Sequence, residues 1–190
     1  MDTVPLVLPN RLKDTYDFEY VIDLQEAIYG RAAALDLSRA TFIEPYSMLS
    51  LLLIGRNYLR KRGSKLRLTG IPINIHQYLH RMDFFKAGVF EVPEPLNEKL
   101  LLKRSTFSNR VLEIIEIPNK ERESVRVISG IVGVFRKRAE HILKYWLAER
   151  ITDYFVTVIS EICQNIYEHS LDSGYLAMQT YSVGKENIVR

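Results

Sequence analysis

Short apolar segments alternate with segments of helical length over the first half of the chain, and this order constrains the fold more than any other feature. Three segments favour helices, namely Asp17–Tyr29, a segment that Pro45 opens, and Ile73–Met82. The apolar segments expected to form strands are Val4–Leu8, Arg31–Leu37, Lys65–Leu68 and Val89–Val92. Strands that alternate with helices favour an α/β fold with at least some parallel pairing.

The second half has a different order, a strand followed by two helices and a further strand. Val111–Ile117 alternates in the manner of a strand, and Pro118 and Asn119 end it. The turn signal Leu171-Asp172-Ser173-Gly174 separates the second helix from the second strand. The remaining expected elements are a helix from about Glu121 to Trp146, a helix through Glu161–Ser170, a strand at Tyr175–Tyr181 and the start of another at Asn187–Val189.

A proline-containing, charged segment separates the two halves. Residues 94–110 follow Pro93, include Pro95 and then carry mixed charge, which is typical of a linker. The sequence therefore predicts one domain at 1–93, a linker at 94–110 and a second domain at 111–190.

Composition limits where and how the protein acts. The chain is 47% hydrophobic and 26% charged, so it can bury a core. Its single cysteine, Cys163, excludes an internal disulfide and a cysteine-rich zinc site. No stretch of about 20 apolar residues could span a bilayer, and the N-terminus lacks the pattern of a signal peptide. We expect a soluble, cytoplasmic protein that does not bind membranes.

Net charge gives little support for nucleic-acid binding. The formal net charge is +3, and the basic residues concentrate in Arg60–Lys65 and Arg136–Arg138. The first run follows a helix, whose C-terminus cations complement, and the second is expected on one exposed helix face. We therefore do not expect nucleic acid as a partner.

Glu161 and Asn165 are the leading candidate site residues. Their four-residue spacing places both on one face of a helix. This spacing also arises on ordinary solvated helix faces, but here a strand and a helix precede it and a turn and a strand follow. The whole arrangement resembles the N box of the GHKL (histidine kinase-like) ATP-binding fold, in particular the serine kinases that act as bacterial anti-sigma factors.

The resemblance implies a role for each residue. Asn165 would ligate the Mg²⁺ that bridges the phosphates of ATP, and Glu161 would act as general base or orient the attacking group. Glu168 and His169 belong to the pattern with a structural role at the helix end. Mg²⁺ prefers oxygen ligands and retains several waters, so one amide oxygen together with phosphates suffices. A carboxylate within reach of a nucleophile can accept its proton.

The other motifs of that family do not occur in the sequence. Neither an Asp-x-Gly-x-Gly segment nor a glycine-rich phosphate loop is present. We therefore expect only the N-terminal part of a GHKL-type α/β sandwich in residues 111–190, an incomplete nucleotide site, and little activity from this chain alone.

The first domain resembles the STAS domain of anti-sigma factor antagonists, a mixed sheet with helices. Ala34–Ser38 and Phe42–Leu49 are similar to its strand and switch loop, and His80–Phe85 to its last helix and turn. Pro45 occupies the place of the phosphorylatable serine, so the resemblance implies a docking or dimerising module that has lost its switch. We do not transfer the role to Ser47.

Together the resemblances predict a bacterial signal-transduction regulator of the partner-switching type. It would bind Mg-ATP and contact a regulatory protein of the sigma-factor or antagonist type. A homodimer is a further expectation. Whether the whole protein is a serine kinase or an ATPase is left open. The alternative is a non-enzymatic scaffold with a degenerate nucleotide site. His76 and His80 have metal-ligand spacing without an evident third ligand, and we interpret them as packing residues.

Overall fold

The chain divides into two compact units, Met1–Arg104 and Ser105–Arg190. The computed structural model describes residues 4–13, 19, 23, 28–29, 33–93, 108–170, 172–184 and 186–190. Most of the expected linker at 94–110, and most of the helix expected at Asp17–Tyr29, lie outside the described residues.

A four-stranded parallel sheet organises the first unit, in the order β1-β3-β5-β6. A separate parallel pair joins β2 to β4. The strands are β1 (Val4–Val7), β2 (Arg11–Leu12), β3 (Ala33–Asp36), β4 (Phe42–Ile43), β5 (Leu66–Thr69) and β6 (Phe90–Glu91).

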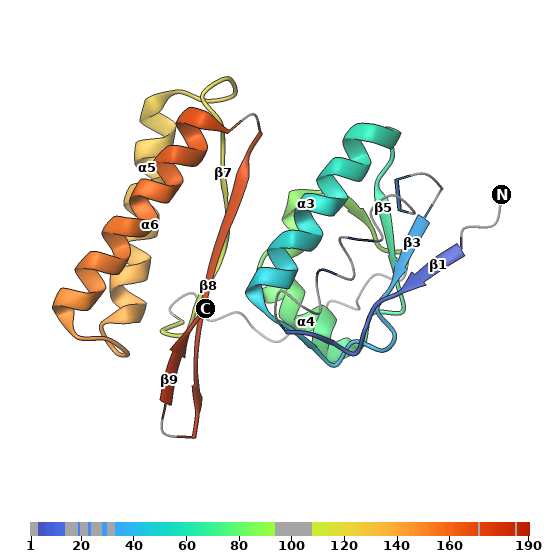
Figure 1. The fold of residues 1–190 in the computed structure, drawn as a ribbon, viewed down its shortest axis with the longest axis horizontal. Coiled ribbons are helices and arrows are strands. Elements are labelled where there is room, and N and C mark those ends of the chain that lie inside the picture. Colours follow the sequence, from blue (N-terminus) through green and yellow to red (C-terminus); the bar gives the residue numbers. More distant parts are fainter. Residues whose placement is uncertain are drawn as a thin grey trace. The chain divides into compact units, whose positions relative to one another are not determined.

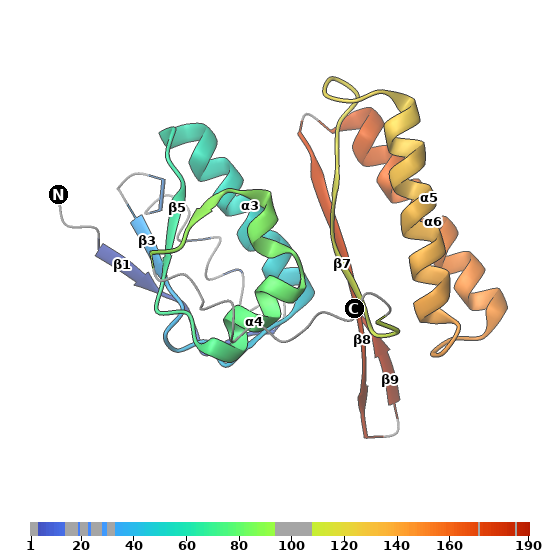
Figure 2. The ribbon, with the colours of Figure 1, turned by 180° about the vertical axis from the view of Figure 1, so that it is seen from behind.

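The α/β class and the expected parallel pairing are confirmed, whereas the mixed sheet that the STAS resemblance implies is not seen among the described strands of this unit. Every strand pairing described in it is parallel. The connection from β3 to β5 explains this, because it contains a helix long enough to carry the chain back across the sheet. Right-handed crossovers in one direction place their helices on one face, where α3 and α4 lie in Figures 1 and 2.

Helix α3 (Pro45–Arg62) begins where the sequence predicts, but it continues through the first three residues of the basic run that was expected to follow it. Pro45 is its first residue, and Gly63 ends it in the left-handed conformation with φ of 68°. The Gly63 N–H donates to the Leu59 carbonyl over 2.9 Å. The basic residues of Arg60–Arg62 occupy the last turn, where they complement the helix dipole.

Two further helices are described in this unit, α4 (Ile73–Arg81) and the 3₁₀ helix η1 (Phe84–Ala87). Phe84 is fully buried, and its ring stacks on Phe90 with centroids 4.9 Å apart. Gly55 of α3 lies against Phe90, and only a residue without a Cβ fits there without a shift.

The second unit is an antiparallel sheet with two helices on one face (Figures 1 and 2). The sheet order is β7-β8-β9. The core between the layers contains Leu112 of the sheet, Phe135 and Ile142 of the first helix, and Val156 of the second. In chain order the elements are β7 (Val111–Ile117), α5 (Val125–Leu143), α6 (Glu149–His169), β8 (Gly174–Val183) and β9 (Glu186–Val189).

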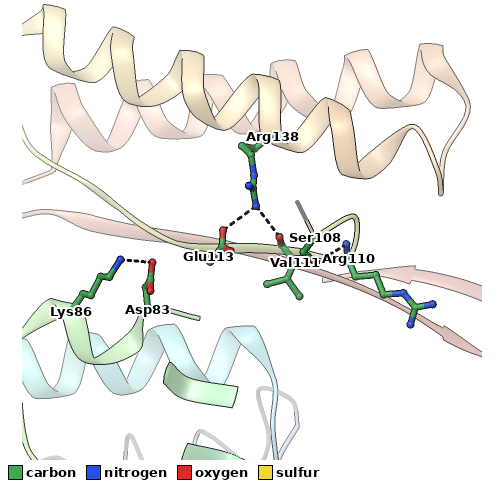
Figure 3. Close-up of polar contacts among 7 residues, drawn as sticks. All are labelled: Asp83, Lys86, Ser108, Arg110, Val111, Glu113 and Arg138. Atoms are coloured by element: carbon green, nitrogen blue, oxygen red, sulfur yellow. Dashed lines mark hydrogen bonds and ion pairs between the residues drawn. The ribbon is translucent and has the colours of Figure 1, made fainter. Parts of the chain in front are cut away.

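A bulge interrupts the pairing of β7 with β8. The register shifts between Leu112 and Ile115, and bulges re-aim side chains. Glu113 here accepts a hydrogen bond of 3.0 Å from the Arg138 guanidinium of α5. The same nitrogen of Arg138 lies 3.4 Å from the Val111 carbonyl (Figure 3). The exposed fractions of these side chains are 17% for Glu113 and 28% for Arg138, so the ion pair is partly buried.

Candidate functional site

Helix α6 presents two faces of opposite character. Val156, Cys163 and Tyr167 recur at intervals of seven and four residues and are buried in the cores beneath the helix. This periodicity is the reason the segment folds as an amphipathic helix on the sheet. Residues half a turn away are therefore directed to solvent.

Glu161 and Asn165 both lie on the solvent face of α6, as their spacing predicts. Both are exposed, and neither side chain has a hydrogen-bond or ion-pair partner among the described residues. An amide oxygen and a carboxylate are thus available one turn apart. Oxygen donors of this kind fit Mg²⁺ when phosphate oxygens complete its coordination. The described part of the chain contains no cluster of three or more acidic, histidine or cysteine side chains that could hold a metal ion.

Glu168 and His169 occupy the end of the helix, where we placed a structural role. The Gln164 amide donates to the Glu168 carboxylate one turn later. The imidazole of His169 lies 3.6 Å from the same carboxylate, and its side chain is exposed. This ladder of contacts engages Glu168, which leaves Glu161 and Asn165 as the available pair.

Hydrogen bonds anchor the C-terminal end of α6 to the segment before α5. The Tyr167 hydroxyl donates to the Glu123 carbonyl over 3.1 Å. In return the Lys120 N–H donates to the Tyr167 carbonyl over 2.9 Å. Arg122 lies 3.6 Å from Asp172 in the turn that follows the helix. Asn165 lies only two residues before Tyr167, so the fixed backbone there holds it in place.

The other sequence candidates occupy packing positions. His76 is buried and contacts the Phe85 ring edge-on at 5.0 Å. Burial, together with the nearby charge of His80, lowers the pKa of His76. Cys163 is buried between α6 and the sheet, and burial raises the pKa of its thiol, which disfavours the reactive thiolate.

The segment similar to the STAS switch loop offers no accessible serine hydroxyl at or beside the position that Pro45 occupies. Pro45 starts α3, and Ser47 in its first turn is fully buried, with no hydrogen-bond partner for its Oγ among the described residues. A kinase could not reach this hydroxyl in the folded chain. The burial of Ser47 is consistent with our decision not to assign it the role of phosphoryl acceptor.

The structure also reveals features that sequence patterns did not indicate. The run Arg136–Arg138 is not one exposed face, because Arg138 turns inward to Glu113 while Arg136 pairs with Glu140 at 3.6 Å. At the opposite end of α6 from Asn165, a cleft opens beside Thr152. Sequence periodicity gives no signal of this cleft, because the turn between α5 and α6 forms it.

An apolar stripe also follows the solvent face of α6. Its members recur at intervals of three and four residues and are between 45% and 61% exposed. They are Ile151, Tyr154, Val158 and Ile162. The stripe leads directly to Asn165.

Comparisons with protein-family models, with curated proteins and with solved structures found no match. Function is therefore argued from the residues and their geometry. No helix in the described parts of the chain is long and apolar enough to cross a bilayer.

Proposed function

We propose that the chain belongs to a bacterial partner-switching regulator, in which the second unit binds Mg-ATP and the first contacts a regulatory protein. One observation carries this proposal: Glu161 and Asn165 lie exposed and unpartnered on one face of α6 among the described residues, within a strand, helix, helix, strand order. That order is the one that the GHKL resemblance implies. We place the protein in the cytoplasm, where ATP is abundant.

The two side chains have separable tasks. Asn165 offers its amide oxygen to Mg²⁺, which needs few protein ligands when phosphates are present. Glu161 accepts the proton of an attacking hydroxyl, either a partner serine or water. When bound, Mg-ATP supplies the phosphoryl group and the cation that offsets its charge. Positioning and charge stabilisation account for most of catalysis in phosphoryl transfer, so kinase and ATPase activities both fit this pair.

The first unit supplies the protein contact in this proposal. Its similarity to STAS domains implies docking on a sigma factor or an antagonist, or pairing with a second copy. Pro45 lacks a hydroxyl and Ser47 is buried, so a contact regulated by phosphorylation of this loop is not proposed. The contact would respond to the nucleotide state of the second unit.

The test is a Mg-ATP titration followed by amide resonances of the intact chain at millimolar nucleotide. We expect shifts centred on the C-terminal half of α6 that are lost in Asn165→Ala. Glu161→Ala should retain the shifts, because this carboxylate acts on the attacking group and not on Mg²⁺. Thr157→Ala, an exposed change on the same helix, is the matched control. Shifts that persist in Asn165→Ala, or no binding by the wild-type chain, would remove the Mg-ATP assignment.

The apolar stripe of α6 favours a second candidate, a non-enzymatic scaffold. Contiguous exposed apolar surface of this kind marks protein contacts on soluble proteins. In this case a partner covers the stripe, and Asn165 contributes an ordinary polar contact at its edge. A scaffold predicts no nucleotide binding, together with loss of partner capture in Val158→Asp. The same substitution would leave Mg-ATP shifts at Asn165 in place if the first candidate is correct.

A further inference from the structure

An open cleft of about 580 Å³ lies where α5 ends and α6 begins. This end of the helix pair is far along α6 from Asn165, about four turns away by the helical repeat. The cleft therefore belongs to neither task proposed above. Seven polar side chains line it. Lys137, Glu140 and His141 of α5 and Lys144 just after that helix form one wall, and Glu149, Thr152 and Asp153 of α6 form the other.

The two walls carry opposite charge. Lys137 and Lys144 line the α5 wall, where the carboxylate of Glu140 is paired with Arg136 at 3.6 Å, so the lysines set the charge of that wall. Glu149 and Asp153 line the α6 wall one turn apart. No ion pair joins the walls among the described residues. Lys144 instead lies 5.1 Å from the centre of the Tyr145 ring. Opposite charges thus border a space without neutralising each other across it.

The α6 wall also contains a polar group without a partner. Thr152 is 4% exposed, and its Oγ1 has no hydrogen-bond partner among the described residues. A buried threonine in a helix commonly bonds the carbonyl four residues earlier, but the Ala148 carbonyl here accepts the Ile151 and Thr152 N–H groups. An unsatisfied buried hydroxyl is unfavourable, and a ligand in the cleft would relieve it.

The start of α6 adds a site for negative charge at the same place. Ala148 is the residue before its first turn and provides no side-chain cap. The first N–H groups of a helix lack partners within it and favour anions. A carboxylate of a ligand could accept from them while it faces Lys144.

We propose that this cleft binds a small zwitterion of the free amino-acid class. Its carboxylate would face Lys137, Lys144 and the start of α6, and its ammonium would face Glu149 and Asp153. An anion alone would meet the acidic wall, and a cation alone would meet the lysines, so only a ligand with both charges complements both walls. The volume is within the range of small-molecule sites. The proposal does not depend on nucleotide binding.

The test is a thermal-shift and saturation-transfer screen of the twenty L-amino acids at millimolar concentration against the intact chain. For each amino acid that binds, two derivatives are then tested. The carboxamide lacks the negative charge of the carboxylate, and the N-acetyl derivative lacks the positive charge of the ammonium group. We expect binding of the parent amino acid and loss of at least about tenfold in affinity for each derivative, equivalent to about 1.4 kcal/mol. If either derivative bound as tightly as its parent amino acid, the proposal of a zwitterionic ligand would be overturned. Failure of every amino acid to bind would also overturn it.

Substitutions locate the site. Asp153→Asn and Lys137→Met should each weaken binding about tenfold, whereas Glu168→Gln, an exposed carboxylate at the other end of α6, should not change it. Thr152→Val removes the unsatisfied hydroxyl, so it should raise the unfolding temperature of the free protein. The same substitution should lower the affinity for the amino acid, because the hydroxyl can no longer bond it. Unchanged affinity in Asp153→Asn and Lys137→Met, both folded, would show that the ligand binds elsewhere.

Discussion

Replacing Gly55 with alanine should destabilise the first unit, although alanine is the better helix former. Gly55 lies in the interior of α3, where the exchange would ordinarily gain about 0.8–1 kcal/mol. A Cβ at this position would lie 2.7 Å from Cζ of Phe90, 2.8 Å from its Cε1 and 2.9 Å from Cγ2 of Val89. These separations are shorter than van der Waals contact, so a neighbour must move.

The neighbour that would have to move is held in place. Phe90 is buried and stacks on the fully buried Phe84. Inserting a methyl group into a packed core costs about 1–3 kcal/mol, which exceeds the helix-propensity gain. We expect a net loss of about 1 kcal/mol, or a fall of about 4–8 °C in the unfolding temperature of a unit of this size.

Gly130 provides the matched control. It is exposed in the interior of α5, and a Cβ added there would meet no neighbouring atom within 4 Å. Gly130→Ala should therefore stabilise the second unit by about 0.8–1 kcal/mol. Urea unfolding followed by far-UV circular dichroism reports both units, and the fluorescence of Trp146, the single tryptophan, reports the second.

The two substitutions should act in opposite directions. Gly55→Ala should lower the midpoint seen by circular dichroism and leave that of Trp146 fluorescence in place. Gly55→Ala should cost less stability in a chain that also carries Phe90→Leu than it does in the wild-type chain, because the smaller side chain makes room for the added methyl group. An increase in stability for Gly55→Ala, equal to that of Gly130→Ala, would refute the packing argument.

Three further predictions concern buried or partly buried polar groups. A double-mutant cycle with Glu113→Gln and Arg138→Met should give a coupling of about 1–3 kcal/mol in urea unfolding, and a coupling near zero would contradict the bulge contact. The pKa of His76 is lowered in the folded state. As the pH falls below about 6.5, the unfolded state therefore binds more protons than the folded state, and the free energy of unfolding decreases. His76→Gln should flatten this decline between about pH 7.5 and 5.5, while a profile identical to wild type would contradict it. Cys163 should react with a maleimide only at the rate of unfolding, because it is buried and its pKa is raised; rapid labelling of the folded chain would contradict this.

Local sequence patterns were sufficient for elements whose ends have chemical markers. Pro45 opens α3, and the apolar alternation of Val111–Ile117 matches β7. The strand expected at Asn187–Val189 is β9, one residue longer. In these cases side-chain periodicity and caps decide the local structure, and packing then reinforces it.

Patterns failed where the outcome depends on contacts between distant residues. The alternation of β7 gives no sign of a bulge, so the inward turn of Glu113 toward Arg138 became visible only in the paired sheet.

The candidate sites show the same distinction. The helical repeat was enough to place Glu161 and Asn165 on one face, and the structure adds that this face is exposed. The charged cleft could not be predicted, because the turn after α5 is what brings Lys137 and Asp153 to opposite walls. Periodicity describes one helix at a time and contains no information about that turn.

The order of pairing in the second sheet has a consequence for synthesis on the ribosome. The Thr180 hydroxyl bonds the Arg110 carbonyl, a contact that spans 70 residues. At about 5–20 residues per second, β7 leaves the ribosome roughly 4–14 s before β8 can pair with it. Helices α5 and α6 form far faster than that. For most of that interval the nascent chain carries an unpaired β7 and the uncovered apolar side of α5, because α6 is completed only shortly before β8. This interval is when chaperones would have most to protect.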